Sequence, residues 1–237
     1  MCGRFSLTLA WSDLAALYRI GDRSIPRNLA PRYNIAPTQG VTAVRTDPVS
    51  GQRELVELRW GLVPSRARDT SVGARMINAR AETVAEKPAL HQALARRRCL
   101  IPADGFYEWQ ARATGPKRPF LVAMSDASPF AFAGLWERWD RSADGKPVES
   151  CTIITTTAND LVRPIHDRMP VILAAEHHEA WLDVAGRPPE AVVGLLTPFP
   201  ADRMAARPVS TYVNTVAHDD ARCFEPADDA DTDLFGT

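Results

Sequence analysis

Cysteine is scarce in this sequence of 237 residues, and the four cysteines lie far apart at positions 2, 99, 151 and 223. There is no Cys-x-x-Cys pair and no Cys/His cluster, so we expect no metal site and no cofactor. Charged side chains interrupt residues 1–25 where a signal segment would be apolar, and no hydrophobic run could span a bilayer. These absences predict a cytoplasmic protein with reduced thiols and no membrane contact.

Repeats, low-complexity segments and a strong net charge are also missing. The formal net charge is -1 at pH 7, and 24% of the residues are charged. Any surface that binds nucleic-acid phosphates must therefore be a local basic patch, balanced by acid elsewhere, such as residues 228–233. No composition break marks a domain boundary, and the chain is long enough to bury a core without disulfide or metal staples.

The second residue carries the most distinctive chemistry. If Met1 is removed, Cys2 presents an α-amine and a thiol on adjacent carbons, and such an aminothiol condenses with an aldehyde to a five-membered thiazolidine. The amine and the thiol titrate at about pH 8 and 8.5, so modest neighbouring effects supply a neutral amine and some thiolate. Arg4 places a fixed positive charge close by. Taken alone, a cysteine at position 2 more often belongs to a frayed terminus without function.

Periodicity predicts a mixture of short helices and strands. Residues 11–18 read as a helix with Ser12 as its cap and Leu14, Leu17 and Tyr18 on one face. Two strands, 41–45 and 55–60, can pair across the turn at 47–51. Further strands are expected at 120–124, 130–136 and 151–156, with a hairpin loop at 137–149 and an extended segment at 208–214.

Two later stretches contain candidate catalysts. Glu108 lies in the strand-like run 105–109, where alternation places it on the face of Phe106; there it is either exposed or partly desolvated, and desolvation raises a carboxyl pKa toward the range useful for proton transfer. His166 lies in a loop between two prolines directly after a strand, a usual position for site residues, although a lone histidine is more often structural. The three arginines at 96–98 complement the C-terminal end of a predicted helix and need not bind DNA.

Six segments of the chain, taken in order, form a pattern that no one of them shows alone. They are Met1-Cys2-Gly3-Arg4-Phe5, Trp60-Gly61-Leu62-Val63-Pro64, Asn78-Ala79-Arg80-Ala81-Glu82-Thr83, Gly105-Phe106-Tyr107-Glu108-Trp109, Ile165-His166-Asp167-Arg168-Met169-Pro170 and, more weakly, Val209-Ser210-Thr211-Tyr212-Val213-Asn214. Together these segments resemble one family, the SOS-response-associated peptidase (SRAP) domain proteins, which shield abasic sites in single-stranded DNA by covalent attachment. The resemblance covers nearly the whole chain, and five motifs in order make it specific.

The resemblance implies an α+β fold, a single compact domain with a mixed barrel-like sheet and flanking helices, over residues 1–225, followed by an acidic flexible tail at 226–237. It implies a monomer that acts on single-stranded DNA containing abasic sites, in the cytoplasm and at the nucleoid when bound to DNA. The implied site roles are as follows: Cys2 is the nucleophile, Asn78 orients it or the sugar, Glu108 is the acid/base, His166 assists near the sugar, and Arg4, Arg80 and Arg168 contact phosphates.

One segment departs from the family pattern. Residues 65–68 read Ser-Arg-Ala-Arg, where relatives often carry tryptophan, so an aromatic wedge that would stack on bases is missing. Two other classes of function stay open at this point. Cys2 and His166 could serve a cysteine peptidase or amidohydrolase with self-processing activity, or the protein could bind nucleic acid without catalysis.

Overall fold

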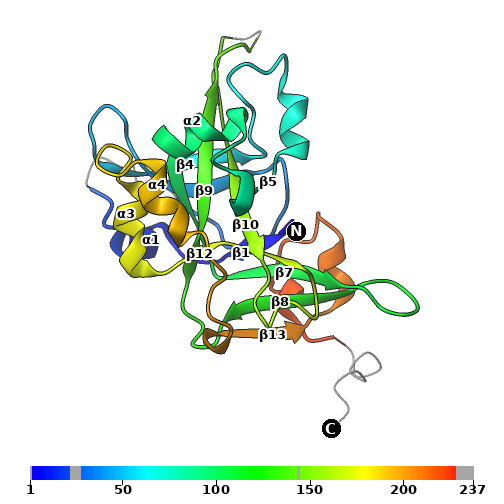
Figure 1. Cartoon of the computed structure of the whole chain (residues 1–237). Coiled ribbons are helices and arrows are strands. Elements are labelled where there is room, and N and C mark those ends of the chain that lie inside the picture. Colours follow the sequence, from blue (N-terminus) through cyan, green and yellow to red (C-terminus); the bar gives the residue numbers. More distant parts are fainter. Residues whose placement is uncertain (1, 22–27, 143–144, 228–237) are drawn as a thin grey trace.

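The centre of the molecule is a closed ring of strands (Figure 1). The structure is a computed structural model that describes residues 2–21, 28–142 and 145–227. Its helices and strands, in chain order, are β1 (Phe5–Leu7), α1 (Trp11–Leu17), β2 (Arg32–Ile35), β3 (Gly40–Thr46), β4 (Arg53–Trp60), β5 (Asn78–Arg80), α2 (Pro88–Arg96), β6 (Arg98–Ala103), β7 (Gly105–Gln110), β8 (Arg118–Met124), β9 (Phe130–Trp139), β10 (Val148–Thr157), β11 (Arg168–Pro170), β12 (Ile172–Leu173), α3 (His178–Leu182), α4 (Pro189–Val192) and β13 (Met204–Pro208).

Strand pairing closes the ring. Strand β3 pairs antiparallel with β4 and β6, β6 with β9, and β9 with β10. Strand β10 then returns to β4 in a parallel pair, with Cys151 opposite Trp60, and the pairing continues along β10 to the short parallel strand β5. One parallel closure among antiparallel pairs makes the barrel mixed. The predicted α+β class with a barrel-like mixed sheet is therefore confirmed.

A second sheet lies against one end of the barrel (Figure 1). Its order is β13-β8-β7-β1-β2, and every pair in it is antiparallel. Strand β1, only four residues from the start of the chain, therefore sits inside this sheet between β7 and β2 and not at its edge. A terminus that is paired on both sides is fixed in space, which a frayed terminus is not.

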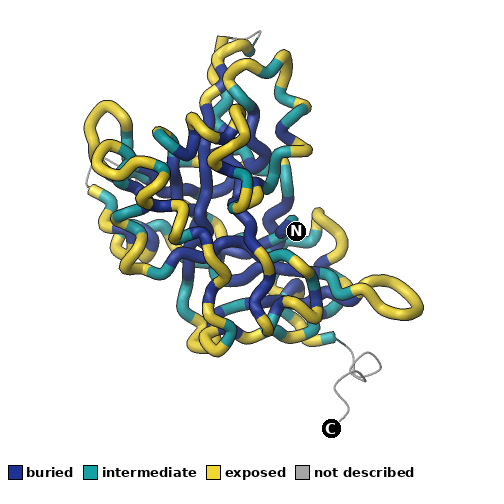
Figure 2. Tube along the Cα trace, in the orientation of Figure 1, coloured by how far each residue is buried: buried dark blue, intermediate teal, exposed yellow. Residues whose placement is uncertain are grey.

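The core runs through the barrel strands, while the exposed residues lie in the surrounding loops (Figure 2). All six residues of β6 are buried, and β9 is buried at every position but Arg138. Phe5 packs edge to face on Trp60 and Phe132, with ring centroids 5.2 and 5.6 Å apart, so β1 is anchored to the barrel by its aromatic side chain. Burial of one such side chain contributes about 1.5–3 kcal/mol. None of the described helices is long and apolar enough to cross a bilayer.

Two glycines bring the segment after β4 close to the strand that carries Asn78. Gly61 has a φ of 125°, and a Cβ atom there would lie 2.6 Å from the carbonyl oxygen of Gly73. Only glycine tolerates both conditions. The Trp60 indole N–H also donates to the Ile77 carbonyl over 2.9 Å. The Trp-Gly motif thus holds the backbone immediately before Asn78.

Three local predictions were wrong in detail. Helix α1 starts at Trp11 after Ala10, so Ser12 lies within the helix and is not its cap; Leu17 is 46% exposed, whereas Leu14 and Tyr18 are buried as expected. The segment after β13 forms a 3₁₀ helix at Thr211–Asn214, capped by the Ser210 side chain, where an extended segment was expected. The predicted pairing of β3 with β4 and the β9–β10 hairpin are confirmed.

Arg98 is the third correction. It belongs to β6 and not to the end of the preceding helix, and it is 1% exposed. Its guanidinium donates to the carbonyls of Leu94, Trp181, Asp183 and Arg187, at 2.6–2.9 Å. The Leu94 carbonyl is in the last turns of α2, so Arg98 still satisfies the end of that helix, from the neighbouring strand.

Candidate active site

Cys2 is completely buried at the entrance to strand β1. The Tyr107 backbone N–H donates to the Arg4 carbonyl over 2.9 Å, and Phe5 lies opposite Phe106 in the sheet. This antiparallel register carries Cys2 past Tyr107 toward Glu108. The predictions of a reactive N-terminal cysteine and an acid/base in β7 thus fall on two segments that the second sheet places side by side.

Asn78 reaches the same place from the barrel. It lies on β5, opposite Ile153 of β10, and its side-chain amide donates to the Cys2 carbonyl over 2.8 Å. The Asn78 Oδ1 atom is buried without a hydrogen-bond partner. An amide that fixes the cysteine backbone with its nitrogen and presents a buried acceptor with its oxygen is suited to receive a hydroxyl or an amine of a bound ligand.

Glu108 is 3% exposed, on the strand face of Phe106, which packs into the main core. Tyr107 and Trp109 point to the opposite side and pack in a separate cluster, as strand alternation predicts. Burial raises the pKa of the Glu108 carboxyl to about 6, with the Asp167 carboxylate adding to the effect. A carboxyl with this pKa can both accept and donate a proton near neutral pH.

The Cys2 thiol is kept protonated. Burial, followed by the Glu108 carboxylate, raises the pKa of this thiol well above its ordinary range, against a hydrogen bond from the Arg4 backbone N–H. The sulfur therefore becomes a nucleophile only when another group takes up its proton. Glu108 is the carboxylate whose charge raises the pKa of this thiol. The sequence-based expectation of some thiolate at neutral pH does not fit this environment.

His166 lies in the loop between β10 and β11, which is attached to β7 where the Gln110 side chain donates to the Pro164 carbonyl over 3.0 Å. Desolvation lowers the pKa of His166. Its Nδ1 atom lies 3.0 Å from the Arg168 backbone N–H, which it accepts when it is unprotonated. The same nitrogen lies 2.9 Å from the Asp167 carboxylate, to which it donates when it is protonated. These two contacts favour opposite protonation states of Nδ1, so His166 can take up and release a proton at this position.

The three arginines with predicted phosphate contacts differ in their surroundings. Arg80, at the end of β5, is exposed. Arg168 is held by a two-point ion pair with Glu82, at 2.6 and 3.0 Å, and its side chain is only 15% exposed. Arg4 is half-buried and donates from Nη1 to Asn34 and to a backbone carbonyl. Of the three, Arg80 has the guanidinium most accessible to a phosphate.

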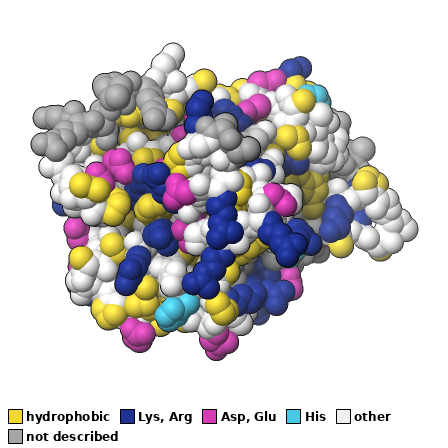
Figure 3. Space-filling model, turned by 90° about the horizontal axis from the view of Figure 1, so that it is seen from above, with side chains coloured by type: hydrophobic (Ala, Val, Ile, Leu, Met, Phe, Trp, Pro, Cys, Tyr) yellow, Lys and Arg dark blue, Asp and Glu magenta, His cyan; other side chains and the backbone are white. Residues whose placement is uncertain are grey.

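Cations also gather on the face of the molecule seen from above (Figure 3). The segment that leads from the Trp-Gly motif to β5 runs along the top of Figure 1 and contributes exposed arginines. They are Arg66, Arg68 and Arg75. The Ala67 carbonyl accepts the Trp139 indole N–H over 2.9 Å, so this basic segment is attached to the β9–β10 hairpin. Positive charge close to the site attracts a polyanion without reading its sequence.

Several residues around the site escaped the sequence reasoning. Glu82 was part of a matched motif, but its pairing with Arg168 was not expected. Asn34 is completely buried in β2, a position where asparagine has low propensity, and this mismatch was the available signal. No group of three His, Cys, Asp or Glu residues in the described part of the chain is arranged to hold a metal ion.

Known proteins resemble this chain over nearly its whole length. A family model described as SOS response associated peptidase (SRAP) matches residues 1–216. The chain is 43% identical over 226 residues to the abasic site processing protein YoaM of Bacillus subtilis (strain 168), covering 95% of this chain and 98% of that protein. It is 33% identical over 264 residues to the abasic site processing protein HMCES of Gallus gallus, covering 95% and 78%.

Among solved structures, a protein from Bacteroides thetaiotaomicron superposes with a TM-score of 0.84 at 26% identity, over 95% of this chain and 100% of that one. The family model extends across both sheets and all the candidate site residues. The match therefore concerns the whole fold and not a single motif. This chain belongs to the SOS response associated peptidase (SRAP) family.

Proposed function

We propose that this protein links itself covalently to abasic sites in single-stranded DNA, through a thiazolidine formed by Cys2 once Met1 has been removed. The observation that carries the proposal is the placement of the buried Cys2 between the Asn78 amide, 2.8 Å from its carbonyl, and the Glu108 carboxyl, whose pKa is about 6. The names of YoaM and HMCES, both abasic site processing proteins, support it.

The chemistry follows from these groups. An abasic deoxyribose opens to an aldehyde, and the Cys2 amine adds to the aldehyde carbon. Glu108, when protonated, donates the proton with which the carbinolamine loses water, and an imine results. The sulfur then bonds to the imine carbon. Its proton leaves through the Glu108 carboxylate and the nitrogen gains one, so the net change is the loss of one water.

Ring closure competes with strand cleavage. The imine would also permit loss of a proton from the adjacent sugar carbon and elimination of the 3′ phosphate, the reaction of an abasic-site lyase. A sulfur held next to the imine carbon closes the ring intramolecularly, and such proximity is worth many orders of magnitude in effective concentration. The protein therefore protects the lesion and does not cut the strand.

Binding precedes the reaction and requires phosphate contacts. Arg80 is exposed, and the basic segment at 66–75 adds charge beside it. These contacts hold a single strand without reading bases, so affinity falls with salt. We infer that the protein works as a monomer in the cytoplasm and associates with the nucleoid only while it is bound to DNA.

The peptidase alternative is disfavoured by the electrostatics of the site. A cysteine peptidase works with a thiolate and an imidazolium. Here burial raises the pKa of the Cys2 thiol and lowers that of His166, so the ion pair is disfavoured at both ends. The one hydrolysis that we retain is self-processing, the removal of Met1. A protein made without cellular aminopeptidase and then weighed by mass spectrometry tests it, because self-processing alone removes the methionine there.

An abasic oligonucleotide tests the main proposal. Incubation with the protein at neutral pH should give an adduct that survives a denaturing gel, with a mass equal to protein plus DNA minus one water. The same oligonucleotide with an intact base should give none. If the abasic strand gives no shifted band, the covalent mechanism is wrong; if it is cut instead, elimination wins over ring closure.

A further inference from the structure

Arg4 connects the reactive cysteine to a distant part of the chain. It follows Cys2 by two residues, its backbone N–H acts on the Cys2 thiol by lowering the pKa of that thiol, and its carbonyl accepts the Tyr107 N–H over 2.9 Å. Its side chain points the other way, where Nη1 donates to Asn34 Oδ1 over 2.7 Å and to the Val213 carbonyl over 2.9 Å. The guanidinium also lies 5.5 Å from the Trp109 ring centroid. Any displacement of Arg4 therefore moves the hydrogen-bond donor that faces the sulfur.

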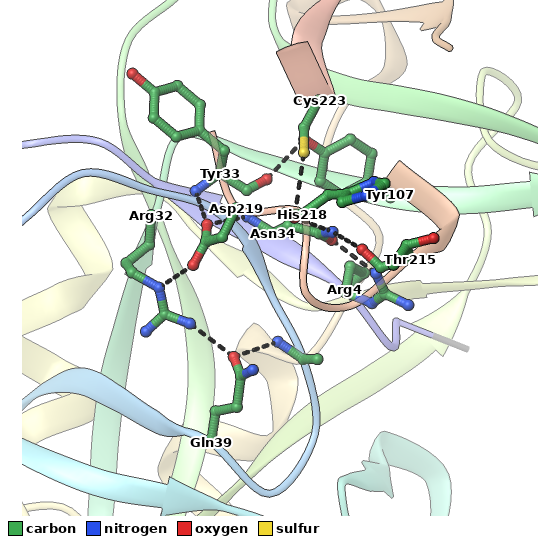
Figure 4. Close-up of polar contacts among 11 residues, drawn as sticks. Arg4, Arg32, Tyr33, Asn34, Gln39, Tyr107, Thr215, His218, Asp219 and Cys223 are labelled. Carbon is green, nitrogen blue, oxygen red and sulfur yellow. Dashed lines mark hydrogen bonds and ion pairs between the residues drawn. The ribbon is translucent and has the colours of Figure 1, made fainter. Parts of the chain in front are cut away.

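Asn34 is the residue that holds the Arg4 side chain. Its Oδ1 accepts from Arg4, while its Nδ2 donates to the carbonyls of Thr215 and His218 at 3.1 and 2.6 Å (Figure 4). The Val213 carbonyl lies 3.1 Å from the same nitrogen and shares one of its two hydrogens. One side chain thus binds Arg4 on one side and the 213–218 loop on the other. A carboxylate could accept from Arg4 but would repel the carbonyls, and an aliphatic side chain could do neither.

Asp219 in turn fixes the backbone of Asn34. One carboxylate oxygen accepts the N–H groups of Tyr33 and Asn34, at 2.5 and 2.8 Å, and the other pairs with Arg32. Arg32 also donates to Gln39 over 2.7 Å (Figure 4). These contacts are charge-assisted and partly buried, the stronger class of hydrogen bond. Strand β2 and the C-terminal loop are therefore joined on both sides of Asn34.

We propose that Asn34 is a positioning residue for the sulfur of Cys2, acting through Arg4. The inference rests on the proposed function. Cys2 is held at two points: Asn78 fixes its carbonyl over 2.8 Å, and on the other side the backbone of Arg4, bonded to the Tyr107 N–H over 2.9 Å, directs its own N–H at the thiol. Asn34 supports only the second point. Its loss should leave the amine able to form the imine, while the sulfur loses the placement needed to close the ring.

This separation gives a measurement that reports on sulfur placement and not on the amount of folded protein. An imine hydrolyses when the protein is denatured, unless cyanoborohydride has first reduced it by delivering hydride to the imine carbon. A thiazolidine survives denaturation without reduction. The ratio of spontaneous adduct to reductively trapped adduct, taken from the same protein sample, therefore measures ring closure against imine formation, and unfolded molecules lower both.

The experiment compares Asn34→Ala with the parent and with Ser210→Ala. The Ser210 side chain accepts the Tyr212 N–H in the same loop and has no hydrogen bond to Arg4 or Asn34. Ser210→Ala therefore controls for the effect of loosening this loop without removing the support of Arg4. We expect Asn34→Ala to slow closure by about 10- to 100-fold, the range that small misplacements cost, and to shift the product toward trapped imine. Ser210→Ala should keep the ratio of the parent.

The outcomes separate the two proposals. A parent that gives adduct by neither route refutes the proposed function. A parent that closes normally beside an Asn34→Ala protein with an unchanged ratio refutes the positioning role. If Asn34→Ala does not fold, Asp219→Asn replaces it, because this change weakens the support of the Asn34 backbone. The ratio should then shift in the same direction by a smaller amount, and an unchanged ratio would again refute the positioning role. Arg4→Ala combined with Asn34→Ala should shift the ratio no further than Arg4→Ala, because both act through one contact.

Discussion

Replacing Glu108 by glutamine should make the protein more stable at neutral pH while making it a poorer catalyst. The folded protein holds this carboxyl at a pKa of about 6, against an ordinary value of 4.5, chiefly because burial disfavours its charge. A raised carboxyl pKa means that the protonated form favours folding. The contribution is fully present below pH 4.5 and is lost as the pH rises through 6.

The size follows from the shift. A difference of about 1.5 pKa units corresponds to about 2 kcal/mol of unfolding free energy, lost mostly between pH 4.5 and 6. In a protein of this length each kcal/mol moves the melting temperature by about 2–4 °C. The difference in melting temperature between variant and parent should therefore be about 4–8 °C larger, in favour of the variant, at pH 8 than at pH 4. Calorimetry of the two proteins across this range measures it.

Exposed Glu57 supplies the matched control, since Glu57→Gln makes the same change of side chain at the surface, where burial adds no cost to the charge. The reasoning is refuted if the difference between Glu108→Gln and the parent stays constant from pH 4 to pH 8. A constant difference would mean that the carboxylate is not disfavoured by its surroundings, and the assignment of Glu108 as the acid/base poised near neutral pH would lose its physical basis.

Four further outcomes are expected. Glu108→Gln should slow adduct formation about 10²- to 10⁴-fold with little change in DNA affinity, measured by gel and by fluorescence anisotropy; equal rates from pH 5 to 8 would make its role structural. Blocking the Cys2 amine with a retained Met1 or a tag residue should abolish the adduct but not DNA binding, and equal adduct yields would exclude the imine. Arg80→Ala should lower the slope of log affinity against log salt by about one unit, whereas Arg168→Ala should lower it less, because Glu82 already neutralises Arg168. Gly61→Ala should unfold the protein or cost several degrees of melting temperature, since its Cβ meets the Gly73 carbonyl, while Gly115→Ala, where φ is also positive at 82° but the space is open, should cost less.

Local patterns were sufficient for much of the fold. Alternation in 105–109 correctly separated Phe106 from Tyr107 and Trp109, and two apolar runs joined by a turn correctly paired β3 with β4. What failed depends on contacts distant in sequence. Ser12 has the chemistry of a cap, but the helix starts two residues earlier than such a cap implies, with Ala10 at the N-cap. Arg98 leaves the helix because carbonyls near residue 181 and beyond receive its guanidinium.

The candidate site shows the same division. Motifs named Cys2, Asn78, Glu108 and His166, and the structure brings Asn78 and Glu108 to Cys2. Their ionisation could not be predicted, because the pKa of Cys2 and of Glu108 depends on how completely the fold excludes water. The pairing of Arg168 with Glu82 and the support of Arg4 by Asn34 join residues 86 and 30 positions apart, and no local pattern carries that information.

The contact between Arg4 and the Val213 carbonyl joins residues 209 positions apart, and its consequence concerns the timing of synthesis. At ribosomal rates of about 5–20 residues per second, roughly 10–40 s pass between the emergence of these two residues. During that interval the start of the chain lacks one of its final partners. The Arg4 side chain gains the Val213 carbonyl late, as expected for contacts of such long range. In a chain that ends before Val213, the guanidinium would keep Asn34 as a hydrogen-bond partner and would lack this carbonyl.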